Sequence, residues 1–519
     1  MTSFKCLSRI GSSDAVYSRY GLVLVLALAF FLRVWQINES LWLDELHTAW
    51  VVHGPFSEIT QRARIGNQSP LYFMLVWMAT AILGNNELGL RFLSLASGVA
   101  LVGATFWLIR KWTGNPLVAC CGATLVAWDR NFIFYSQEAR PYALMQLVAV
   151  GQVVSLWCLQ QSNRHWLRAT YVLGTVLLIY LHITAALLLV AECIWLLPAL
   201  ALRRRGAVYE IRHFAVDMIC VAAAVVPLIP QLLSIASRRA SWALFAGNHS
   251  WSEMAGWFSL EEYVVLPLFG LVIASLLERS GNDRPAAPKS DLLAIYLVTC
   301  WFVVPVVVAW LATITETARL FFPRYLLASA LAPIIFAGLC LSAVRQVRIQ
   351  NTLLTIVLGV SVYQGGTVQR FLADGRFLHD RNQDWPGAAQ LINSTDGPFD
   401  RPVLVRSGFL EADRLLSNSS DLLRRYCLAT VTSLYQIDAG HQFIPLPTTN
   451  SGHLDDVALS AIRQRGGAWF VVNGSARTHA KFERDLAATL QQHGLNAGHY
   501  VTTTFGEVLV IELRLSGYN

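Results

Sequence analysis

Long apolar runs alternate with short polar segments over roughly the first 370 residues of the chain. An apolar run of about 20 residues is long enough to cross the hydrocarbon core of a bilayer as a helix. The pattern predicts about eleven spans, at residues 20–37, 88–109, 115–134, 141–159, 167–181, 183–202, 213–236, 260–277, 291–312, 325–344 and 352–368. After Arg370 these runs disappear.

The polar segment after the first predicted span has helical spacing of its own. Residues 44–53 predict one helix that is broken at Gly54-Pro55, and residues 56–65 predict a second that ends at Gly66. Residues 70–83 are apolar, but as a helix they rise only about 21 Å, against a hydrocarbon core of about 30 Å. We therefore expect all three segments in the first outer loop.

Basic residues cluster in alternate loops. The positive-inside rule places such loops, and the amino terminus, in the cytoplasm, and it places the polar tail outside. The clusters are Arg110-Lys111, Arg164/Arg168, 203–205, Arg279/Arg284/Lys289 and Arg345/Arg348. The pair at 238–239 is an exception. We expect a multi-pass protein of the plasma (inner) membrane.

The residues after 370 resemble an ordinary soluble domain in composition. Residues 384–393 and 481–493 have helical spacing, whereas 403–406 and 469–472 are typical of buried strands. Residues 500–515 alternate around Gly506 like a hairpin. We predict a transmembrane domain at 1–369 and a small extracytoplasmic α/β domain at 370–519.

Composition supports the membrane assignment and narrows the function. The 519 residues are 55% hydrophobic, with a mean hydropathy of +0.46, which is too apolar for a soluble enzyme. The net charge of +7 could indicate nucleic-acid binding, but the basic residues lie in short clusters between apolar runs. We therefore expect no nucleic-acid partner. The nine cysteines show no disulfide framework and no metal-ligand spacing.

Asp44 and Glu45 form an acidic pair just after the first span. A charge at the bilayer centre costs roughly 2.5–3.5 kcal/mol on insertion scales, so such residues usually lie at an interface or serve a site. Either carboxylate could cap a short interfacial helix. Alternatively, Asp44 is a general base with His47 and Thr48 near it on one helix face.

Further polar residues fall in the predicted outer loops or at the outer ends of helices. A transporter more often places its ionisable groups near the midplane, on broken helices, where this chain has few besides Glu192 and Asp217. The pattern suits chemistry at the membrane surface on a lipid-linked substrate. The outer residues are Asp44, Glu45, Gln68, Glu138, Arg140, His182, Arg319, Arg324 and Tyr325.

Each of these residues also has a purely structural interpretation. Glu138 and Arg140 could cap the helix that follows Pro141, and His182 could be bound to backbone at a helix end. Arg319 and Arg324 could contact lipid headgroups, as interfacial arginines often do.

A series of short motifs resembles the bacterial membrane glycosyltransferases of the GT-C superfamily. The most similar group is the protein O-mannosyltransferase and lipid A aminoarabinose transferase type, glycosyltransferase family 39 and its relatives. The motifs are Trp42-Leu43-Asp44-Glu45, Ser69-Pro70-Leu71-Tyr72, Glu87-Leu88-Gly89-Leu90-Arg91, Tyr135-Ser136-Gln137-Glu138-Ala139-Arg140-Pro141-Tyr142, Tyr180-Leu181-His182, Arg324-Tyr325-Leu326-Leu327 and Gln383-Asp384-Trp385-Pro386-Gly387-Ala388-Ala389.

The resemblance implies transfer of a sugar from a polyprenyl-phosphate carrier to a protein, lipid or glycan on the outer face. It makes Asp44 the candidate general base, with Glu45 beside it as a second catalytic candidate, and Glu138 the second acidic position. A hydroxyl is a poor nucleophile until its proton is taken. The candidate substrate-binding residues are Gln68, Glu138, Arg140, Tyr142, His182, Arg319, Arg324 and Tyr325. The arginines among them suit the phosphate leaving group.

Some points stay open at this level. Some relatives have a lysine before the proline where this chain has Gln68-Ser69-Pro70, so the aminoarabinose specificity is in doubt. Paired carboxylates suit Mg²⁺ or Mn²⁺, so Asp44 and Glu138 could hold a divalent cation, although the sequence demands none. The alternatives are a transporter or flippase of lipid-linked glycans and a polymerase or ligase that uses diphosphate-linked glycans.

Overall fold

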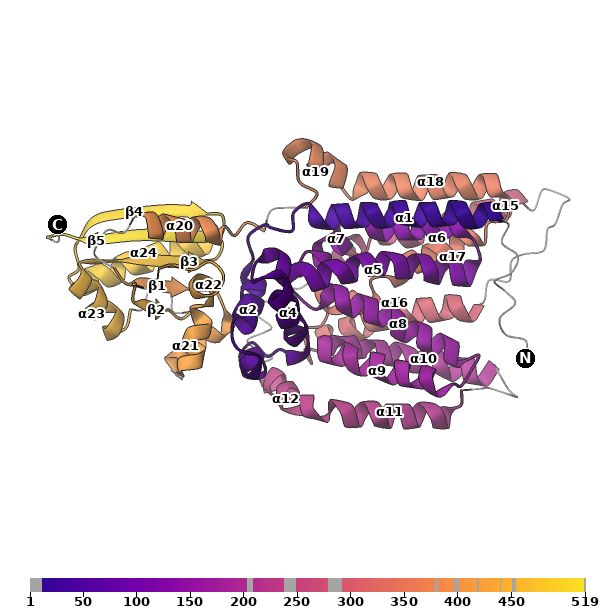
Figure 1. The fold of residues 1–519 in the computed structure, drawn as a ribbon, viewed down its shortest axis with the longest axis horizontal. Coiled ribbons are helices and arrows are strands. Elements are labelled where there is room, and N and C mark those ends of the chain that lie inside the picture. Colours follow the sequence, from indigo (N-terminus) through magenta and orange to yellow (C-terminus); the bar gives the residue numbers. More distant parts are fainter. Residues whose placement is uncertain are drawn as a thin grey trace. The chain divides into compact units, whose positions relative to one another are not determined.

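A computed structural model describes residues 12–202, 209–237, 249–278, 292–378, 381–395, 401–417, 420–438, 440–449 and 454–517 (Figure 1). The chain divides into two compact units. The first unit consists of Met1–Ile37 and Leu93–Leu378, and the second of Asn38–Phe92 and His379–Asn519.

The first unit is helical. Among the described residues, four helices are long and apolar enough to cross a membrane, or up to seven if each bent pair counts as one span. The predicted number of about eleven spans stays a prediction. The elements are α1 (Ser12–Val34), α5 (Glu87–Thr113, which begins in the second unit), α6 (Pro116–Trp128), α7 (Arg130–Ser136), α8 (Tyr142–Leu159), α9 (His165–Leu181), η3 (Ile183–Ala186), α10 (Leu187–Leu202), α11 (Ile211–Val225), η4 (Val226–Leu228), α12 (Ile229–Ser237), α14 (Trp251–Trp257), a π-helical turn (Glu261–Val265), α15 (Leu266–Glu278), α16 (Leu292–Ile314), η6 (Pro323–Ser329), α17 (Ala332–Ser342), α18 (Val347–Gln364) and α19 (Thr367–Asp374).

Two of the predicted spans, at 115–134 and 325–344, are bent rather than straight, and a third bend immediately precedes the predicted span at 260–277. The chain turns by 61° between α6 and α7, by 68° between α14 and the π-helical turn that leads into α15, and by 45° between η6 and α17. At the first bend Asp129 ends α6 and caps α7, because its carboxylate accepts hydrogen bonds from the N–H groups of Asn131 and Phe132. The prediction of one straight helix at 115–134 is therefore wrong, because the helix breaks at Asp129.

The last predicted span also differs from the structure. Instead of one helix at 352–368, α18 begins at Val347 and ends at Gln364, and α19 follows as a separate short helix. Gly366, between them, has a left-handed backbone (φ 65°), which glycine adopts without strain. The basic clusters predicted at 203–205, 238–239 and 279–289 lie outside the described residues. The predicted orientation of the amino terminus stays a prediction.

A buried arginine fastens α1 to the neighbouring helices of the first unit. Arg33 has no exposed surface, and its guanidinium donates to Ser136 Oγ at 3.1 Å and to the carbonyls of Val126 and Ala127. Helix α5 passes close by at Gly98. A Cβ there would overlap Ser136 Oγ and lie 3.0 Å from Arg33 Nε.

Gly98→Ala is therefore expected to destabilise the protein. Overpacking of a core typically costs about 1–3 kcal/mol, and here the added methyl group would also displace the hydrogen bond between Arg33 and Ser136. The matched control is Gly151→Ala in α8, because no described atom lies within 4 Å of a Cβ at that position. The melting temperatures of both variants in detergent test this. A melting temperature for Gly98→Ala equal to that of Gly151→Ala would contradict the close packing.

The second unit contains the short helices predicted for the first outer loop. Their bounds confirm the helical segments predicted from the sequence, including the ends at Gly54 and Gly66: α2 (Leu43–His53), η2 (Phe56–Glu58), α3 (Ile59–Ile65) and α4 (Pro70–Leu83). They pack with C-terminal helices, and the Tyr426 ring lies 5.3 Å from His47 and 5.1 Å from Trp50. From the sequence, this loop was predicted to belong to the transmembrane domain at 1–369. In the structure it forms one unit with the chain after residue 378.

A five-stranded sheet in the order β2-β1-β3-β5-β4 forms the centre of the C-terminal part. Strand β1 pairs in parallel with β2 and β3, while β5 is antiparallel to β3 and β4. The elements are α20 (Trp385–Thr395), β1 (Val403–Arg406), η7 (Leu410–Leu416), α21 (Asp421–Cys427), α22 (Ala429–Thr432), β2 (Phe443–Pro445), α23 (Asp456–Arg465), β3 (Gly467–Asn473), α24 (Ala476–Gln492), β4 (Ala497–Phe505) and β5 (Val508–Leu515).

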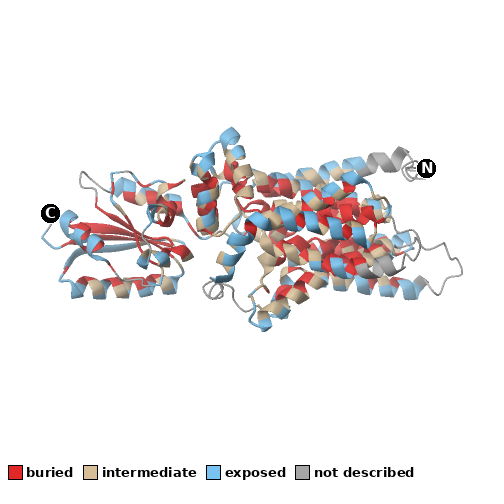
Figure 2. Ribbon diagram, turned by 90° about the horizontal axis from the view of Figure 1, so that it is seen from below, coloured by how far each residue is buried: buried red, intermediate tan, exposed pale blue. Residues whose placement is uncertain are grey.

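The sheet confirms the predicted strands and the terminal hairpin. Both buried strands predicted from the sequence are present as β1 and β3, whereas β2, η7, α21, α22 and α23 were not predicted. Alternate residues of β3, including Phe470, pack with apolar residues of α23 and α24 such as Phe482 in one buried cluster. Figure 2 shows that the middle of the sheet is buried. Strand β3 is buried at every residue, which explains its apolar run, whereas β5 contains Glu512 and the exposed Arg514.

Candidate active site

The acidic pair lies in the first turn of α2, in the second unit. Asp44 is half-buried and Glu45 is fully buried. Glu45 accepts a hydrogen bond of 3.4 Å from the backbone N–H of Trp42, the residue that precedes the helix. The capping interpretation therefore holds for Glu45.

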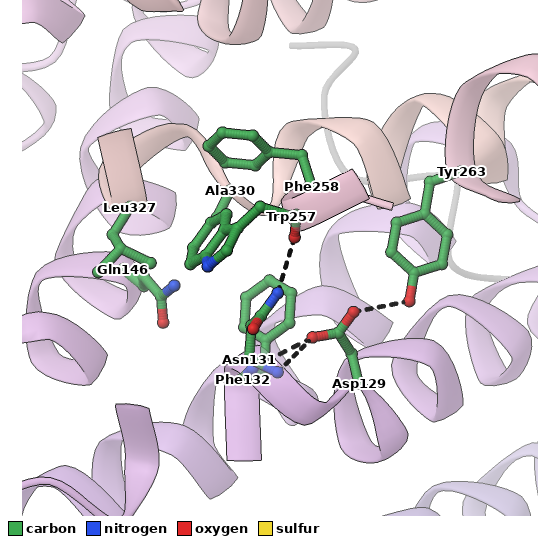
Figure 3. Close-up of a pocket in the computed structure, with 9 residues that line it drawn as sticks. All are labelled: Asp129, Asn131, Phe132, Gln146, Trp257, Phe258, Tyr263, Leu327 and Ala330. Carbon is green, nitrogen blue, oxygen red and sulfur yellow. Dashed lines mark hydrogen bonds between the residues drawn. The ribbon is translucent and has the colours of Figure 1, made fainter. Parts of the chain in front are cut away.

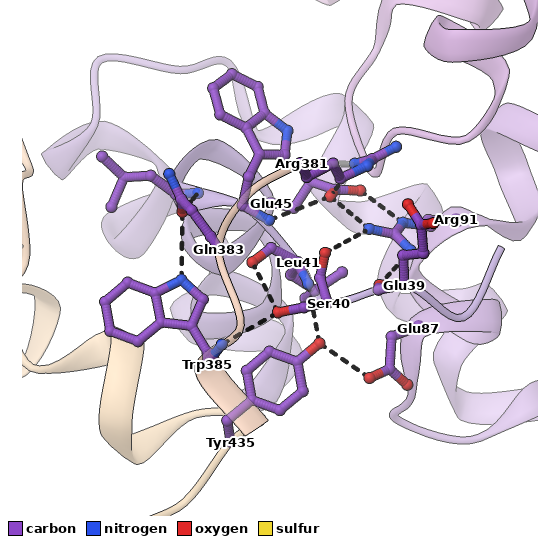
Figure 4. A network of polar contacts seen from close by, with 12 residues as sticks. Glu39, Ser40, Leu41, Glu45, Glu87, Arg91, Arg381, Gln383, Trp385 and Tyr435 are labelled. Atoms are coloured by element: carbon purple, nitrogen blue, oxygen red, sulfur yellow. Dashed lines mark hydrogen bonds and ion pairs between the residues drawn. The ribbon is translucent and has the colours of Figure 1, made fainter. Parts of the chain in front are cut away.

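Two arginines bind the Glu45 carboxylate (Figure 4). Arg91, from the start of α5, donates through Nε to Oε1 at 2.8 Å and through Nη2 to Oε2 at 2.6 Å. Arg381, which precedes α20, donates through Nη1 to Oε2. The side chains of Glu45 and Arg91 have no exposed surface, and that of Arg381 is 6% exposed. Since these donors occupy both carboxylate oxygens, Glu45 is poorly placed to take a proton from a substrate.

Gln68 lies in the same unit, in the turn between α3 and α4. It is half-buried, and its backbone N–H donates to the carbonyl of Ala63 at 3.0 Å. His47, on α2, is buried and packs 5.4 Å from the Phe73 ring. Gly66 is adjacent to this histidine, because a Cβ at that position would overlap the His47 ring.

The other predicted site residues belong to the first unit. Glu138 and Arg140 lie in the turn between α7 and α8, and Tyr142 begins α8; all three are buried. Hydrogen bonds to neighbouring residues fix this turn. Gln137 Nε2 donates to the Arg33 carbonyl at 3.0 Å, and Ser94 Oγ donates to the Arg140 carbonyl, also at 3.0 Å.

A row of rings adjoins this turn. The His182 ring lies 5.8 Å from Tyr142 and 5.7 Å from Tyr325. Thr184 links the segment of His182 to that of Tyr325. Its hydroxyl lies 2.7 Å from His182 Nδ1 and donates to the Tyr325 carbonyl at 2.8 Å. The Arg324 guanidinium lies over the Phe322 ring, 4.8 Å from its centre.

The fold therefore gathers most of the predicted residues of the first unit. The charges of Arg140 and Arg324 both act on His182, and those of Glu138 and Arg324 both act on Tyr135. The neighbourhood thus contains two arginines, and a guanidinium is a cation that can bind a phosphate. Arg319 is exposed, in the segment between α16 and η6.

A pocket lies where the three bent helix pairs turn (Figure 3). Asp129 lines it, and its Oδ2 accepts a hydrogen bond of 2.9 Å from the Tyr263 hydroxyl. Asn131 donates to the Trp257 carbonyl at 2.7 Å. The pocket has room for little more than a water molecule. It is too small for a sugar, so we assign it to the architecture of the bends.

Sequence reasoning missed several buried charged residues. Arg91 stood inside a recognised motif but received no role, and Arg381 and Arg33 received none. A signal existed for Arg33 and Asp129, since each places a charge inside an apolar run. No comparable signal marked Arg381, which lies in a polar segment.

The predicted divalent cation stays a prediction. Among the described residues, no three His, Cys, Asp or Glu side chains gather so that they could hold a metal ion. Glu45 does not fit as a second ligand beside Asp44, because arginines occupy its oxygens. Asp44 and Glu138 belong to different units.

Known proteins resemble this chain in structure rather than in sequence. No protein-family model matches it, and no curated protein does. A crystal structure of ArnT from Cupriavidus metallidurans in the apo state matches with a TM-score of 0.54 and 14% identity, over 96% of this chain and 98% of that one. The same protein bound to undecaprenyl phosphate matches with a TM-score of 0.56 and 13% identity, over 98% and 99%. This chain therefore shares the fold of ArnT over nearly its whole length.

Proposed function

We propose that the protein is a membrane glycosyltransferase that moves a sugar from a polyprenyl-phosphate donor to an acceptor on the outer face of the membrane. The observation that carries the proposal is the match along 98% of the chain to ArnT, a GT-C aminoarabinose transferase whose structure was solved bound to undecaprenyl phosphate. The motif series and the charged residues of the first unit support the same class of donor.

In the proposed reaction Asp44 is the general base. The acceptor hydroxyl gives its proton to the Asp44 carboxylate while its oxygen bonds to the anomeric carbon of the sugar. The bond between that carbon and the phosphate oxygen breaks, and its electron pair leaves with the polyprenyl phosphate. Attack from the opposite side inverts the anomeric centre. Asp44 then returns the proton to water.

We assign the arginines of the first unit to the phosphate. A departing phosphate carries negative charge that cations and N–H donors stabilise, and a planar guanidinium can bind two oxygens at once. Arg140 and Arg324 are the main candidates, because both act on the same histidine. Arg319 is a further, exposed candidate.

The remaining predicted residues take supporting roles. Tyr142, His182 and Tyr325 form adjoining rings that suit contact with a sugar or an isoprenoid chain. Glu138 is the second acidic position. For Glu45 we replace the predicted catalytic role with a positioning role, because two arginines hold it. The chain has Gln68-Ser69-Pro70 where some relatives have a lysine before the proline, so the transferred sugar need not be aminoarabinose.

A transfer assay tests this function against the transporter alternative. Purified protein would be placed in vesicles with a labelled undecaprenyl-phosphate sugar, in a panel that includes mannose, glucose and aminoarabinose, and with membranes of a deletion strain as the source of acceptors. We expect the label in a new glycosidic bond, together with free undecaprenyl phosphate.

Two other outcomes would contradict the proposal. Movement of the intact labelled lipid across the vesicle membrane without bond formation would indicate a flippase. Transfer only from an undecaprenyl-diphosphate sugar would indicate a polymerase or ligase.

A further inference from the structure

We propose that residues 381–385 and Tyr435 are positioning residues for Asp44, so that the C-terminal part of the chain takes part in building the active site. The inference rests on the proposed function, because it concerns the proposed base. It is carried by contacts within the second unit alone.

The residues on both sides of Asp44 are held from the C-terminal part. Leu43 donates its backbone N–H to Gln383 Oε1 at 3.0 Å, and Glu45 accepts from Arg381. The first N–H groups of a helix lack partners within the helix, so Gln383 supplies a cap for α2 from 340 residues away. The backbone at Asp44 is therefore fixed at both neighbours.

The segment that leads into α2 is held in the same way (Figure 4). The Tyr435 hydroxyl accepts a hydrogen bond of 2.9 Å from the Leu41 N–H and donates to Glu87 at 2.9 Å. Burial and the nearby Glu87 carboxylate raise the pKa of Tyr435, so its hydroxyl keeps the proton that it donates. The backbone N–H of Trp385 donates to Ser40 Oγ at 3.4 Å.

Two arginines bind the same buried carboxylate in this cluster, because Arg91 and Arg381 both donate to Glu45. Arg91 alone already binds Glu45 through two hydrogen bonds and also donates to the Glu39 carbonyl at 2.6 Å. Arg381 is thus a second buried cation on a carboxylate that already has one. Its distinct contribution is to connect α2 with the C-terminal part.

Small displacements of a catalytic group are costly. A shift of about 1 Å can reduce a rate by about 10²-fold. Because Arg381 and Gln383 hold the residues next to Asp44, their loss should change the position of the base without removing it. The signature is a lower kcat with an unchanged KM for the donor.

The experiment compares Arg381→Met with Arg401→Met in the full-length protein. Arg401 is a matched control, because it also forms a buried ion pair, with Glu512 at 3.0 Å, but in the sheet and away from α2. With the undecaprenyl-phosphate sugar of the transfer assay, we expect Arg381→Met to lower kcat by about 10–100-fold, with KM for the donor within about twofold. Arg401→Met should keep kcat within about twofold, and Arg381→Lys should restore part of the rate.

A second measurement covers the case in which Arg381→Met folds poorly or no transfer is found. Gln383→Ala removes a single hydrogen bond to α2, and hydrogen exchange in the intact protein should then be faster at residues 43–47. Arg401→Met should leave that exchange unchanged. Unchanged exchange and unchanged kcat in both Arg381→Met and Gln383→Ala would overturn the inference. If wild type transfers no sugar, the proposed function fails, and the exchange result still decides whether these residues position α2.

Discussion

Replacing Asp44 by asparagine is expected to lower the rate of sugar transfer by about 10²–10⁴-fold, the usual contribution of a general base. The amide has nearly the same shape as the carboxylate, but it cannot take the proton from the hydroxyl of the acceptor substrate. Asp44 is half-buried in the first turn of α2, between two residues that other side chains hold in place. The substitution should therefore leave the fold and the amount of protein in the membrane unchanged.

The matched control for Asp44→Asn is Glu58→Gln in the same loop. Glu58 pairs with Arg62 at 2.7 Å, but its side chain is 39% exposed, and exposed ion pairs contribute at most about 1 kcal/mol. We expect Glu58→Gln to transfer sugar at nearly the wild-type rate. Both variants are compared by the transfer of label from the undecaprenyl-phosphate donor. Wild-type turnover in Asp44→Asn would rule out the proposed base.

Replacing Glu45 by alanine is expected to have the largest effect on stability. The substitution leaves Arg91 and Arg381 buried together without the carboxylate that both bind. Removing one partner of a buried ion pair typically costs about 3–5 kcal/mol, which is a large part of the stability of an ordinary domain. We expect a much lower melting temperature in detergent and little folded protein in the membrane.

Glu512→Ala is the control for this second prediction, because Glu512 also binds two arginines. Its partners are Arg401 at 3.0 Å and Arg514 at 2.6 Å, but the Arg514 side chain is 51% exposed. Burial by itself would raise the pKa of Glu512, but the hydrogen bonds from Arg514 and Arg401 outweigh it and lower the pKa. Solvent compensates the loss of this carboxylate better, so the fall in melting temperature should be smaller. If the melting temperature fell equally in the two variants, the complete burial of the Glu45 cluster would add nothing to its contribution to stability.

The proposed division of roles also changes how the acidic pair is interpreted. Two adjacent carboxylates in a sequence suggest shared chemistry, and both were candidates for catalysis. The structure separates them by environment, since Glu45 is fully buried between two arginines while Asp44 is half-buried. One carboxylate thus orders the helix on which the other stands.

Local features of this protein were predictable from the sequence. Helices α2 and α3 end at Gly54 and Gly66 as predicted, and the terminal hairpin turns at Gly506. These features depend on residues close together in the chain, where apolar periodicity and turn residues leave a readable pattern. The bend at Asp129 also had a sequence signal, namely a charge inside an apolar run, although the signal did not reveal the direction of the chain after it.

By itself, the sequence determined that the chain is a membrane protein with a small α/β tail and an acidic pair after its first apolar run, because hydropathy and periodicity are properties of neighbouring residues. Only the tertiary structure decided what Glu45 binds. Its partners Arg91 and Arg381 lie 46 and 336 residues away. Ion pairing between such distant residues depends on how the chain folds back on itself, and it leaves no periodic trace along the chain.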